Sequence, residues 1–171
     1  DVKSLDITIA RINNDMANFV GSTSSSSAPN PVTPKTGGRN IIFYGPPGTG
    51  KSNEIKTRIS DSPTEITVFH PDMQNSDFIG ALKPSIDGEK VTYKFSPGPF
   101  ARALLKAYEH PDKDVYLVIE ELNRAPAMSV FGELFQLLDR EVSGASEYGV
   151  DFPSDEFREW LDHKTSMVHE E

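Results

Sequence analysis

Residues 45–52, Gly-Pro-Pro-Gly-Thr-Gly-Lys-Ser, combine the residue types that bind a chain of phosphates. They match the pattern GxxxxGK[ST] and lie between an apolar run, residues 39–44, and an expected helix, residues 53–59. Glycines allow backbone N–H groups to wrap a triphosphate closely, because a Cβ at these positions would obstruct the approach. The following helix adds unpaired N–H donors and the positive end of its dipole. The sequence therefore predicts a nucleoside triphosphate site.

Two side chains of this loop have separate expected roles. Lys51 supplies a positive charge for the β- and γ-phosphates, and the Ser52 hydroxyl is short enough to bind Mg²⁺. A plain turn before a helix with an exposed lysine is the simpler interpretation. Four fixed positions match by chance in on the order of 1% of chains this long, so nucleotide binding is favoured. The predicted nucleotide-binding residues are Gly45, Pro46, Pro47, Gly48, Thr49, Gly50, Lys51, Ser52 and Asn53.

An acidic pair, Glu120 and Glu121, directly follows the apolar residues 115–119, which are expected to form a strand. Ligands of open α/β sheets lie beyond the carboxyl ends of the strands, so the pair is expected to reach the phosphate loop. Successive strand residues point to opposite sides, which gives the two carboxylates different roles. Glu120 is expected to orient the Mg²⁺ shell, and Glu121 to orient or deprotonate the attacking water. Without a phosphate loop, a solvated strand end would be the simpler interpretation.

Asn123 and Arg124 follow at once and place an amide and a guanidinium near the same edge. Together with Lys51 and Glu121 they are the candidate catalytic residues. They could sense the nucleotide locally, or face a neighbouring subunit as a charge-stabilising group. A helix-capping asparagine and a surface arginine explain the same two residues equally well, so both interpretations stay open.

Composition places the chain among soluble globular proteins. Its 171 residues suffice for one domain with a hydrophobic core, and 25% of them are charged. Cysteine is absent, which excludes disulfides and thiolate metal sites. No apolar run approaches the roughly 20 residues of a membrane span and no signal pattern is present, so we expect a cytoplasmic protein without membrane contact. The net charge of −9 disfavours tight binding of nucleic acid except through a local basic surface.

The N-terminal part of the chain is expected to lie outside the globular core. Apolar residues recur with helical spacing, so residues 1–20 are expected to form an amphipathic helix, although alternation within residues 5–9 also permits a short strand. Residues 21–38 are rich in Ser, Pro and Gly and are expected to be a linker. The core would then comprise residues 39–171.

Within this core, the pattern predicts strands and helices in alternation, including strands at 39–44, 65–70 and 115–119 and helices at 75–80, 97–108, 127–140 and 157–161. Asp87-Gly88 between residues 82–86 and 91–95 predicts a β-hairpin. A hairpin is surplus to a minimal doubly wound sheet, so it is the segment expected to contact a partner or substrate.

Taken together, the phosphate loop and the segment Ile119-Glu-Glu-Leu-Asn-Arg-Ala125 resemble the AAA+ superfamily. Longer strings resemble its McrB-type branch, which supplies the motor subunit of modification-dependent restriction systems. These strings, which with the loop cover about residues 39–149, are Val68-Phe-His-Pro-Asp72, Asp77-Phe-Ile-Gly80, Val91-Thr-Tyr-Lys-Phe-Ser-Pro-Gly-Pro-Phe100, Phe131-Gly-Glu-Leu-Phe-Gln-Leu-Leu-Asp-Arg140 and Ser146-Glu-Tyr-Gly149.

The resemblance implies hydrolysis of ATP or GTP with Mg²⁺ as cofactor, and nucleotide bound between the subunits of a ring that is expected to be a hexamer. It also implies an endonuclease partner of the McrC type, with DNA bound by regions outside this chain. A MoxR-type or dynein-related remodelling ATPase and a non-catalytic nucleotide-binding fragment are the alternatives. A domain of the parent protein that recognises modified DNA would favour the restriction system. Nucleotide binding without phosphate release would favour the non-catalytic nucleotide-binding fragment.

The fold that the resemblance implies is a P-loop NTPase sheet of parallel strands flanked by helices, with the hairpin inserted and the C-terminal side incomplete. In the AAA+ strand order, a sensor strand lies between the phosphate-loop strand and the strand that ends at Glu120, and the chain stops before that segment. The sheet is then expected to lack a central strand unless another segment fills the gap. Glu120 also replaces the usual aspartate. We therefore expect a fragment of a longer enzyme that hydrolyses nucleotide weakly by itself.

Overall fold

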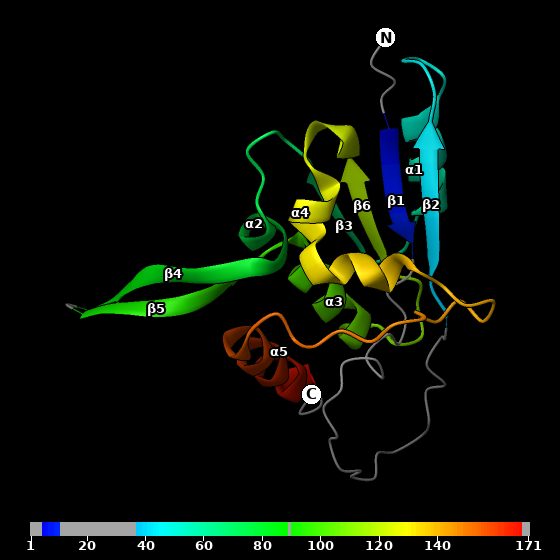
Figure 1. The fold of residues 1–171 in the computed structure, drawn as a ribbon. Helices are drawn as coiled ribbons and strands as arrows, with labels where there is room; N and C mark the ends of the chain where they lie inside the picture. The colour runs from blue at the N-terminus through cyan, green and yellow to red at the C-terminus, as the bar shows by residue number, and fades with distance from the viewer. Residues whose placement is uncertain (1–4, 11–36, 89, 169–171) are drawn as a thin grey trace.

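Among the described residues, a four-stranded sheet with the strand order β2-β1-β6-β3 lies at the centre of the fold (Figure 1). The structure is a computed structural model and describes residues 5–10, 37–88 and 90–168. The sheet consists of β1 (Leu5–Ala10), β2 (Arg39–Tyr44), β3 (Thr64–Val68) and β6 (Tyr116–Glu120). Strands β3 and β6 are parallel, and β1 is antiparallel to both β2 and β6, so every strand except β1 runs in one direction.

The N-terminal segment differs from the predicted amphipathic helix. Residues 5–10 form a strand in which Ile7 pairs with Ile42 on one side and with Ile119 on the other. Residues 11–20 of the predicted helix, and the predicted linker up to residue 36, lie outside the described residues. Pairing along both edges satisfies backbone groups that a gap between β2 and β6 would leave unpaired, which favours the strand over the helix. Strand β1 thus fills the gap that was expected in the sheet.

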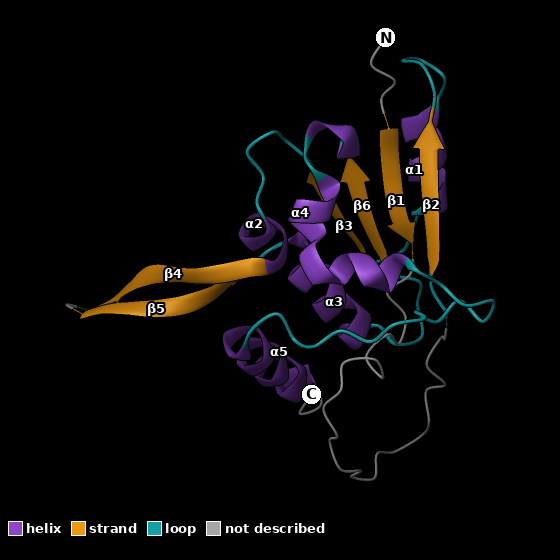
Figure 2. Ribbon diagram, in the orientation of Figure 1, coloured by secondary structure: helices purple, strands orange, loops and turns teal. Residues whose placement is uncertain are grey.

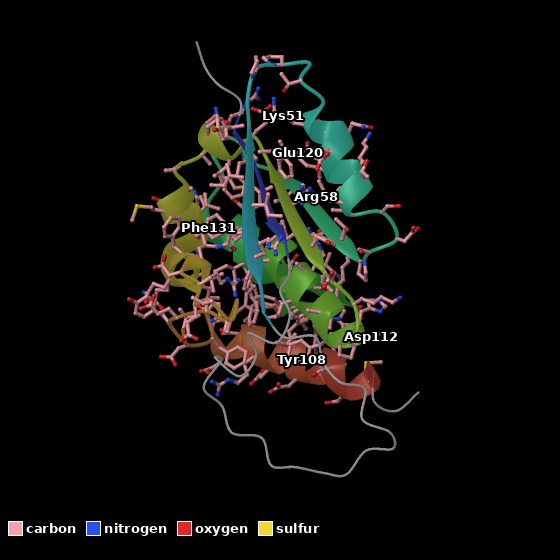
Figure 3. The ribbon with its side chains drawn as sticks, turned by 90° about the vertical axis from the view of Figure 1, so that its right-hand side faces the viewer. Lys51, Arg58, Tyr108, Asp112, Glu120 and Phe131 are labelled. Carbon is pink, nitrogen blue, oxygen red and sulfur yellow. The ribbon has the colours of Figure 1, made fainter. Side chains whose placement is uncertain are left out.

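Helices cover the two faces of this sheet unequally (Figure 2). The helix α1 (Lys51–Arg58) lies on one face, where the Arg58 guanidinium is 5.5 Å from the ring centroid of Phe43 on β2. Helices α2 (Asn75–Ile79), α3 (Pro99–Glu109) and α4 (Ala127–Phe131) lie on the other face. Figure 3 shows Arg58 and Phe131 on either side of the sheet. The predicted helices at 75–80 and 97–108 are confirmed within two residues.

A cluster of phenylalanines joins the helical layer to the sheet. Phe78 of α2 is fully buried, and its ring centroid lies 5.7 Å from that of Phe69, 6.0 Å from that of Phe100 and 4.9 Å from that of Phe131. Phe69 directly follows β3, so these contacts fix α2, α3 and α4 against the outer strand. Aromatic pairs at such distances stabilise a core beyond their buried area.

The predicted helix over residues 127–140 is interrupted. Helix α4 ends at Phe131, and residues 132–138 continue as the 3₁₀ segment η3 (Gly132–Leu138). Gly132 has a φ of 56°, which an α-helix cannot include, and the Asn75 side-chain amide donates a hydrogen bond of 2.9 Å to the carbonyl of Val130. This long-range contact occupies one of the terminal carbonyls of α4, and the prediction of one continuous helix was therefore wrong.

The predicted β-hairpin is confirmed and forms a separate two-stranded sheet of β4 (Gly80–Asp87) and β5 (Lys90–Pro97). Figure 1 shows it extending away from the rest of the molecule. Near its base, Phe95 packs against Phe157 and Trp160 of α5 (Asp155–Val168), a helix much longer than the predicted residues 157–161. No helix in the described ranges is long and apolar enough to cross a membrane.

Candidate nucleotide-binding site

The phosphate loop lies between the end of β2 at Tyr44 and the start of α1 at Lys51. Gly48 and Gly50 have φ values of 79° and 83°, in the left-handed region that side chains disfavour. A Cβ built on either glycine meets no protein atom within 4 Å. The backbone conformation, and not crowding by the protein, therefore requires glycine at these two positions, and the space beside them stays open.

The side chain of Lys51 folds over this loop. Its Nζ donates hydrogen bonds to the carbonyls of Gly45 at 2.9 Å and Pro46 at 3.0 Å. The Thr49 hydroxyl donates to the same Pro46 carbonyl at 2.9 Å. A bound phosphate would offer the ammonium a charged acceptor, which forms a stronger hydrogen bond than a neutral carbonyl.

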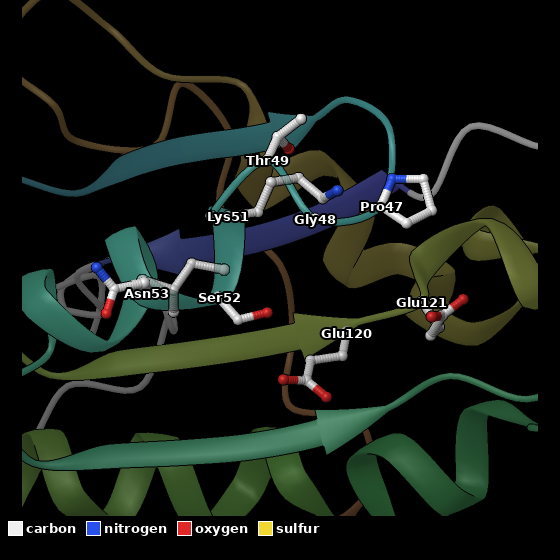
Figure 4. A pocket seen from close by; sticks show the side chains of 10 residues that line it. Pro47, Gly48, Thr49, Lys51, Ser52, Asn53, Glu120 and Glu121 are labelled. Carbon is white, nitrogen blue, oxygen red and sulfur yellow. The ribbon is translucent and has the colours of Figure 1, made fainter.

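One pocket of about 530 Å³ joins the loop to the acidic pair (Figure 4). Residues 47–53 and Ile55 form one side, and Glu120 and Glu121 form the other. Strands β2 and β6 run in the same direction, so both groups lie beyond carboxyl ends at one edge of the sheet. The structure therefore brings together residues that are far apart in the sequence, as the strand pattern predicted.

The two carboxylates have different surroundings. Glu120 is the last residue of β6 and lies opposite Val68 of β3 in the parallel ladder. Glu121 has already left the strand, with φ 56° and ψ 38°, a left-handed conformation that is uncommon for residues other than glycine and asparagine. Its Oε2 lies 3.0 Å from Nε of Arg124. The two carboxylates therefore differ in backbone conformation and in their neighbours.

Asn123 and Arg124 belong to the short 3₁₀ segment η2 (Leu122–Arg124) and are exposed to solvent. Neither residue is among those that line the pocket. Arg124 is connected to the site through Glu121, and within the described residues Pro126, not Asn123, is the N-cap of the following helix α4. The sequence did not indicate this pairing, because it depends on the backbone turn at Glu121.

The sequence prediction also missed Ile55, which lines the pocket and is only 6% exposed. Ile55 lies four residues after Lys51 on α1, so the two residues share one face of the helix. This spacing of four residues is the sequence signal that could have identified Ile55. A buried apolar side chain one turn after Lys51 shields this part of α1 from water.

The oxygen donors in this pocket suit a magnesium–nucleotide complex. The Ser52 hydroxyl and the Glu120 carboxylate are hard oxygen ligands, and Figure 4 shows them facing the same part of the pocket. Within the described ranges, no group of three or more His, Cys, Asp or Glu residues could hold a metal ion on its own. Magnesium at nucleotide sites takes one or two protein ligands and completes its shell with phosphate oxygens and water, so the residues present fit.

A glycine-rich loop between a strand and a helix, next to an acidic strand end on an α/β sheet, defines the class of P-loop nucleoside triphosphatase folds. The chain belongs to the AAA domain family (dynein-related subfamily), whose family model matches residues 40–158. The fold class that the sequence predicted is thereby confirmed.

Two curated relatives place the chain within this family more closely. It is 40% identical over 145 residues to the type II restriction enzyme BsuMI component YdiS of Bacillus subtilis (strain 168), in an alignment that covers 68% of the chain. It is 31% identical over 114 residues to the type IV methyl-directed restriction enzyme EcoKMcrB subunit of Escherichia coli (strain K12), covering 62% of the chain. The chain spans 42% and 24% of the lengths of these relatives. The predicted resemblance to McrB-type AAA+ proteins is confirmed.

Proposed function

We propose that the chain is the nucleotide-binding and hydrolysing core of an AAA+ motor in a modification-dependent DNA restriction system. The observation that carries the proposal is the single pocket shared by residues 47–53 and by Glu120 and Glu121. A loop of backbone donors with a lysine suits a triphosphate, and an adjacent carboxylate suits activation of water. The assignment to restriction is supported by the names of the two relatives, a component and a subunit of restriction enzymes, and dependence on modification by the name of the methyl-directed one alone.

In this proposal, the amides of the loop and Lys51 bind the phosphates of ATP or GTP. Ser52 and Glu120 would hold Mg²⁺, which supplies charge neutralisation at the phosphates when bound. Glu121 would orient the attacking water and accept its proton. Gly45 and Pro46 lie outside the pocket lining, and their carbonyls would contribute by holding Lys51 over the loop before nucleotide binds.

The proposed motor would assemble from several copies of the chain and work with partner proteins. The AAA family and the McrB-type relative support a ring of subunits, expected to be a hexamer, that works with an endonuclease subunit of the McrC type. DNA would be bound by regions outside this chain. The second candidate function is a dynein-related remodelling ATPase, because the matching family model is the dynein-related subfamily. Phosphate release that is stimulated by a protein substrate, and not by modified DNA, would favour this second function.

The test compares nucleotide affinity and phosphate release in the complete protein. We expect Glu121→Gln to bind nucleotide like the wild type while its turnover falls about 100-fold or more, because a general base contributes about 10²- to 10⁴-fold. Lys51→Ala is expected to lose binding. Glu54→Gln is the control, since Glu54 is likewise a glutamate paired with an arginine, but it is more exposed and lies outside the pocket lining. Wild-type turnover in Glu121→Gln would contradict the proposed role.

A further inference from the structure

The β4–β5 hairpin, residues 80–97, has two chemically different faces. Residues directly opposite each other in the ladder point to the same face. One face is apolar, with the pairs Leu82 and Phe95, Pro84 and Tyr93, and Ile86 and Val91. The other face is polar and carries lysines, with the pairs Lys83 and Lys94, Ser85 and Thr92, and Asp87 and Lys90.

Among the described residues, α5 covers this apolar face only at its base. Phe95 packs against α5, with ring centroids 5.7 Å from Phe157 and 5.5 Å from Trp160. Farther out, Ile86 is 80% exposed, Val91 67% and Tyr93 69%. A two-stranded ribbon is marginally stable in water unless something packs on its apolar face. The outer half of the hairpin therefore suits a partner with apolar groups.

The lysine face points to an acidic partner. Lys83 and Lys94 are direct neighbours across the ladder, and like charges at that position destabilise a strand pair. Both side chains are exposed, whereas Lys90 near the tip lies opposite Asp87 in the ladder. The chain as a whole carries a net charge of −9, so this face stands apart from the general charge of the molecule. Carboxylates from a partner would offset the repulsion between the lysines.

The chain itself presents a surface with this chemistry. This surface is the loop of residues 139–148, which we call the acidic turn. Two hydrogen bonds close it, from the Glu147 amide to the Asp139 carbonyl and from the Glu141 amide to the Ala145 carbonyl. Asp139, Glu141 and Glu147 are exposed. Val142 and Tyr148 on the same turn are also exposed, so acidic and apolar groups occur side by side.

The hairpin and the acidic turn lie at opposite edges of the sheet. The turn contacts the start of β2, where the Gly38 amide donates to the Gly144 carbonyl. The hairpin lies next to β3, since one pocket is lined by Thr67 and Val68 together with Lys83 and Ser96. Strands β2 and β3 are the two outer strands of the sheet, and Figure 1 shows the two segments on opposite sides of the molecule. One copy therefore offers a projecting arm at one edge and a complementary surface at the other.

We propose that the β4–β5 hairpin of one copy docks on the acidic turn of a second copy, with Lys83 and Lys94 near its carboxylates and the outer apolar side chains buried. A contact between two different surfaces of identical chains is head-to-tail, and such contacts generate rings when the rotation closes. The inference rests on the ring assembly in the proposed function and names the surfaces that would meet there. It also assigns a role to the projecting hairpin, which takes no part in the nucleotide pocket.

The test uses paired charge reversals and sedimentation of the full chain with Mg²⁺ and a slowly hydrolysed triphosphate. The hairpin variant is Lys83→Glu with Lys94→Glu, and the acceptor variant is Glu141→Lys with Glu147→Lys. Each variant alone is expected to associate about tenfold more weakly than the wild type, because several attractive charge pairs become repulsive. An equimolar mixture of the two variants is expected to associate again, since the unchanged hairpin of one meets the unchanged turn of the other, and the two charge-reversed surfaces are again opposite in charge.

A second double variant, Lys113→Glu with Lys164→Glu, makes the same charge change at exposed sites outside the hairpin and the acidic turn and is expected to associate like the wild type. Nucleotide affinity is measured on every sample, and all variants are expected to keep it. Absent nucleotide binding in the wild type would contradict the proposed function itself. With binding intact, a mixture that stays dissociated, a wild type that never associates, or a hairpin variant that loses only DNA binding would overturn the docking proposal.

Discussion

Arg124 forms an ion pair with Glu121, with Nε 3.0 Å from Oε2, and its backbone amide donates a hydrogen bond of 2.8 Å to the Glu121 carbonyl. Both contacts close a short loop directly after β6. The left-handed backbone of Glu121 is part of the same turn, and residues held in sparsely populated conformations are concentrated at functional sites. The expected water-activating carboxylate is thus oriented by its own chain.

The first prediction concerns this ion pair. Arg124 is 59% exposed and Glu121 33%, and exposed pairs contribute about 0.2–1 kcal/mol. Arg124→Ala is therefore expected to change phosphate release by no more than about fivefold while nucleotide affinity stays the same. Arg58→Ala removes a similar exposed pair with Glu54 and serves as the control. A fall of about 10³-fold or more would instead identify Arg124 as a group that stabilises charge in trans, the other role that the sequence left open.

The second prediction concerns Gly98, which packs against the backbone of α2. A Cβ at Gly98 would clash with the Phe78 carbonyl oxygen, and the φ of −80° is one that alanine accepts easily. Gly98→Ala is therefore expected to lower the free energy of unfolding by about 2–3 kcal/mol through steric strain alone, measured by urea denaturation. Gly88→Ala is the matched control, because its Cβ meets no atom within 4 Å and only the φ of 64° disfavours it. A cost of about 1–2 kcal/mol is expected there.

The third prediction concerns Tyr108, at the end of the fold far from the phosphate loop (Figure 3). Burial, and to a smaller extent the charge of Asp162, raise the pKa of the Tyr108 phenol from 10.0 to about 12. The folded state then holds the proton more tightly than the unfolded state, so stability is full below pH 10 and falls as the pH rises to about 12. Urea denaturation across this range is expected to show a smaller loss for Tyr108→Phe than for the wild type. In a spectroscopic titration, Asp162→Asn is expected to lower the Tyr108 pKa, and an unchanged value would contradict the contribution from that charge.

The fourth prediction concerns β1, which pairs with both β2 and β6. The phosphate loop follows β2 and the acidic pair follows β6, so backbone pairing through β1 sets the distance between the two sides of the pocket. Ile7→Pro removes an amide from the middle of the ladder and is expected to destabilise the chain by about 2–3 kcal/mol and to weaken nucleotide binding. Ile7→Val keeps the amide and is the control. Equal nucleotide affinity in both variants would show that the pocket does not depend on this strand.

Much of the candidate site could be predicted from the sequence, because its signals are local. The loop of residues 45–52 has its chemistry and its flanking elements in consecutive positions, and the apolar run before Glu120 marks a buried strand end without further information. The Asp87-Gly88 turn likewise specified its hairpin locally. In each of these cases, one short segment contains all the residues that determine its local structure.

The errors lie where distant contacts decide the local structure. Residues 5–10 fit helical and alternating patterns alike, and pairing partners 29 to 39 residues away on β2 and more than 100 residues away on β6 select the strand. The break at Gly132 depends on an amide from Asn75, and a Cβ at Gly132 would lie 2.9 Å from that Asn75 nitrogen. Neither relationship can be read from a sequence window that contains only one of the partners.

The position of β1 has a consequence for the order in which the chain can fold. It is the first strand of this sequence to leave the ribosome, yet one of its two neighbours, β6, begins only at Tyr116. The sheet therefore stays open at its centre until most of these residues have been synthesised. Pairings over such separations carry a large loop-closure entropy and are typical of slow-folding domains, so the nucleotide pocket is expected to form late.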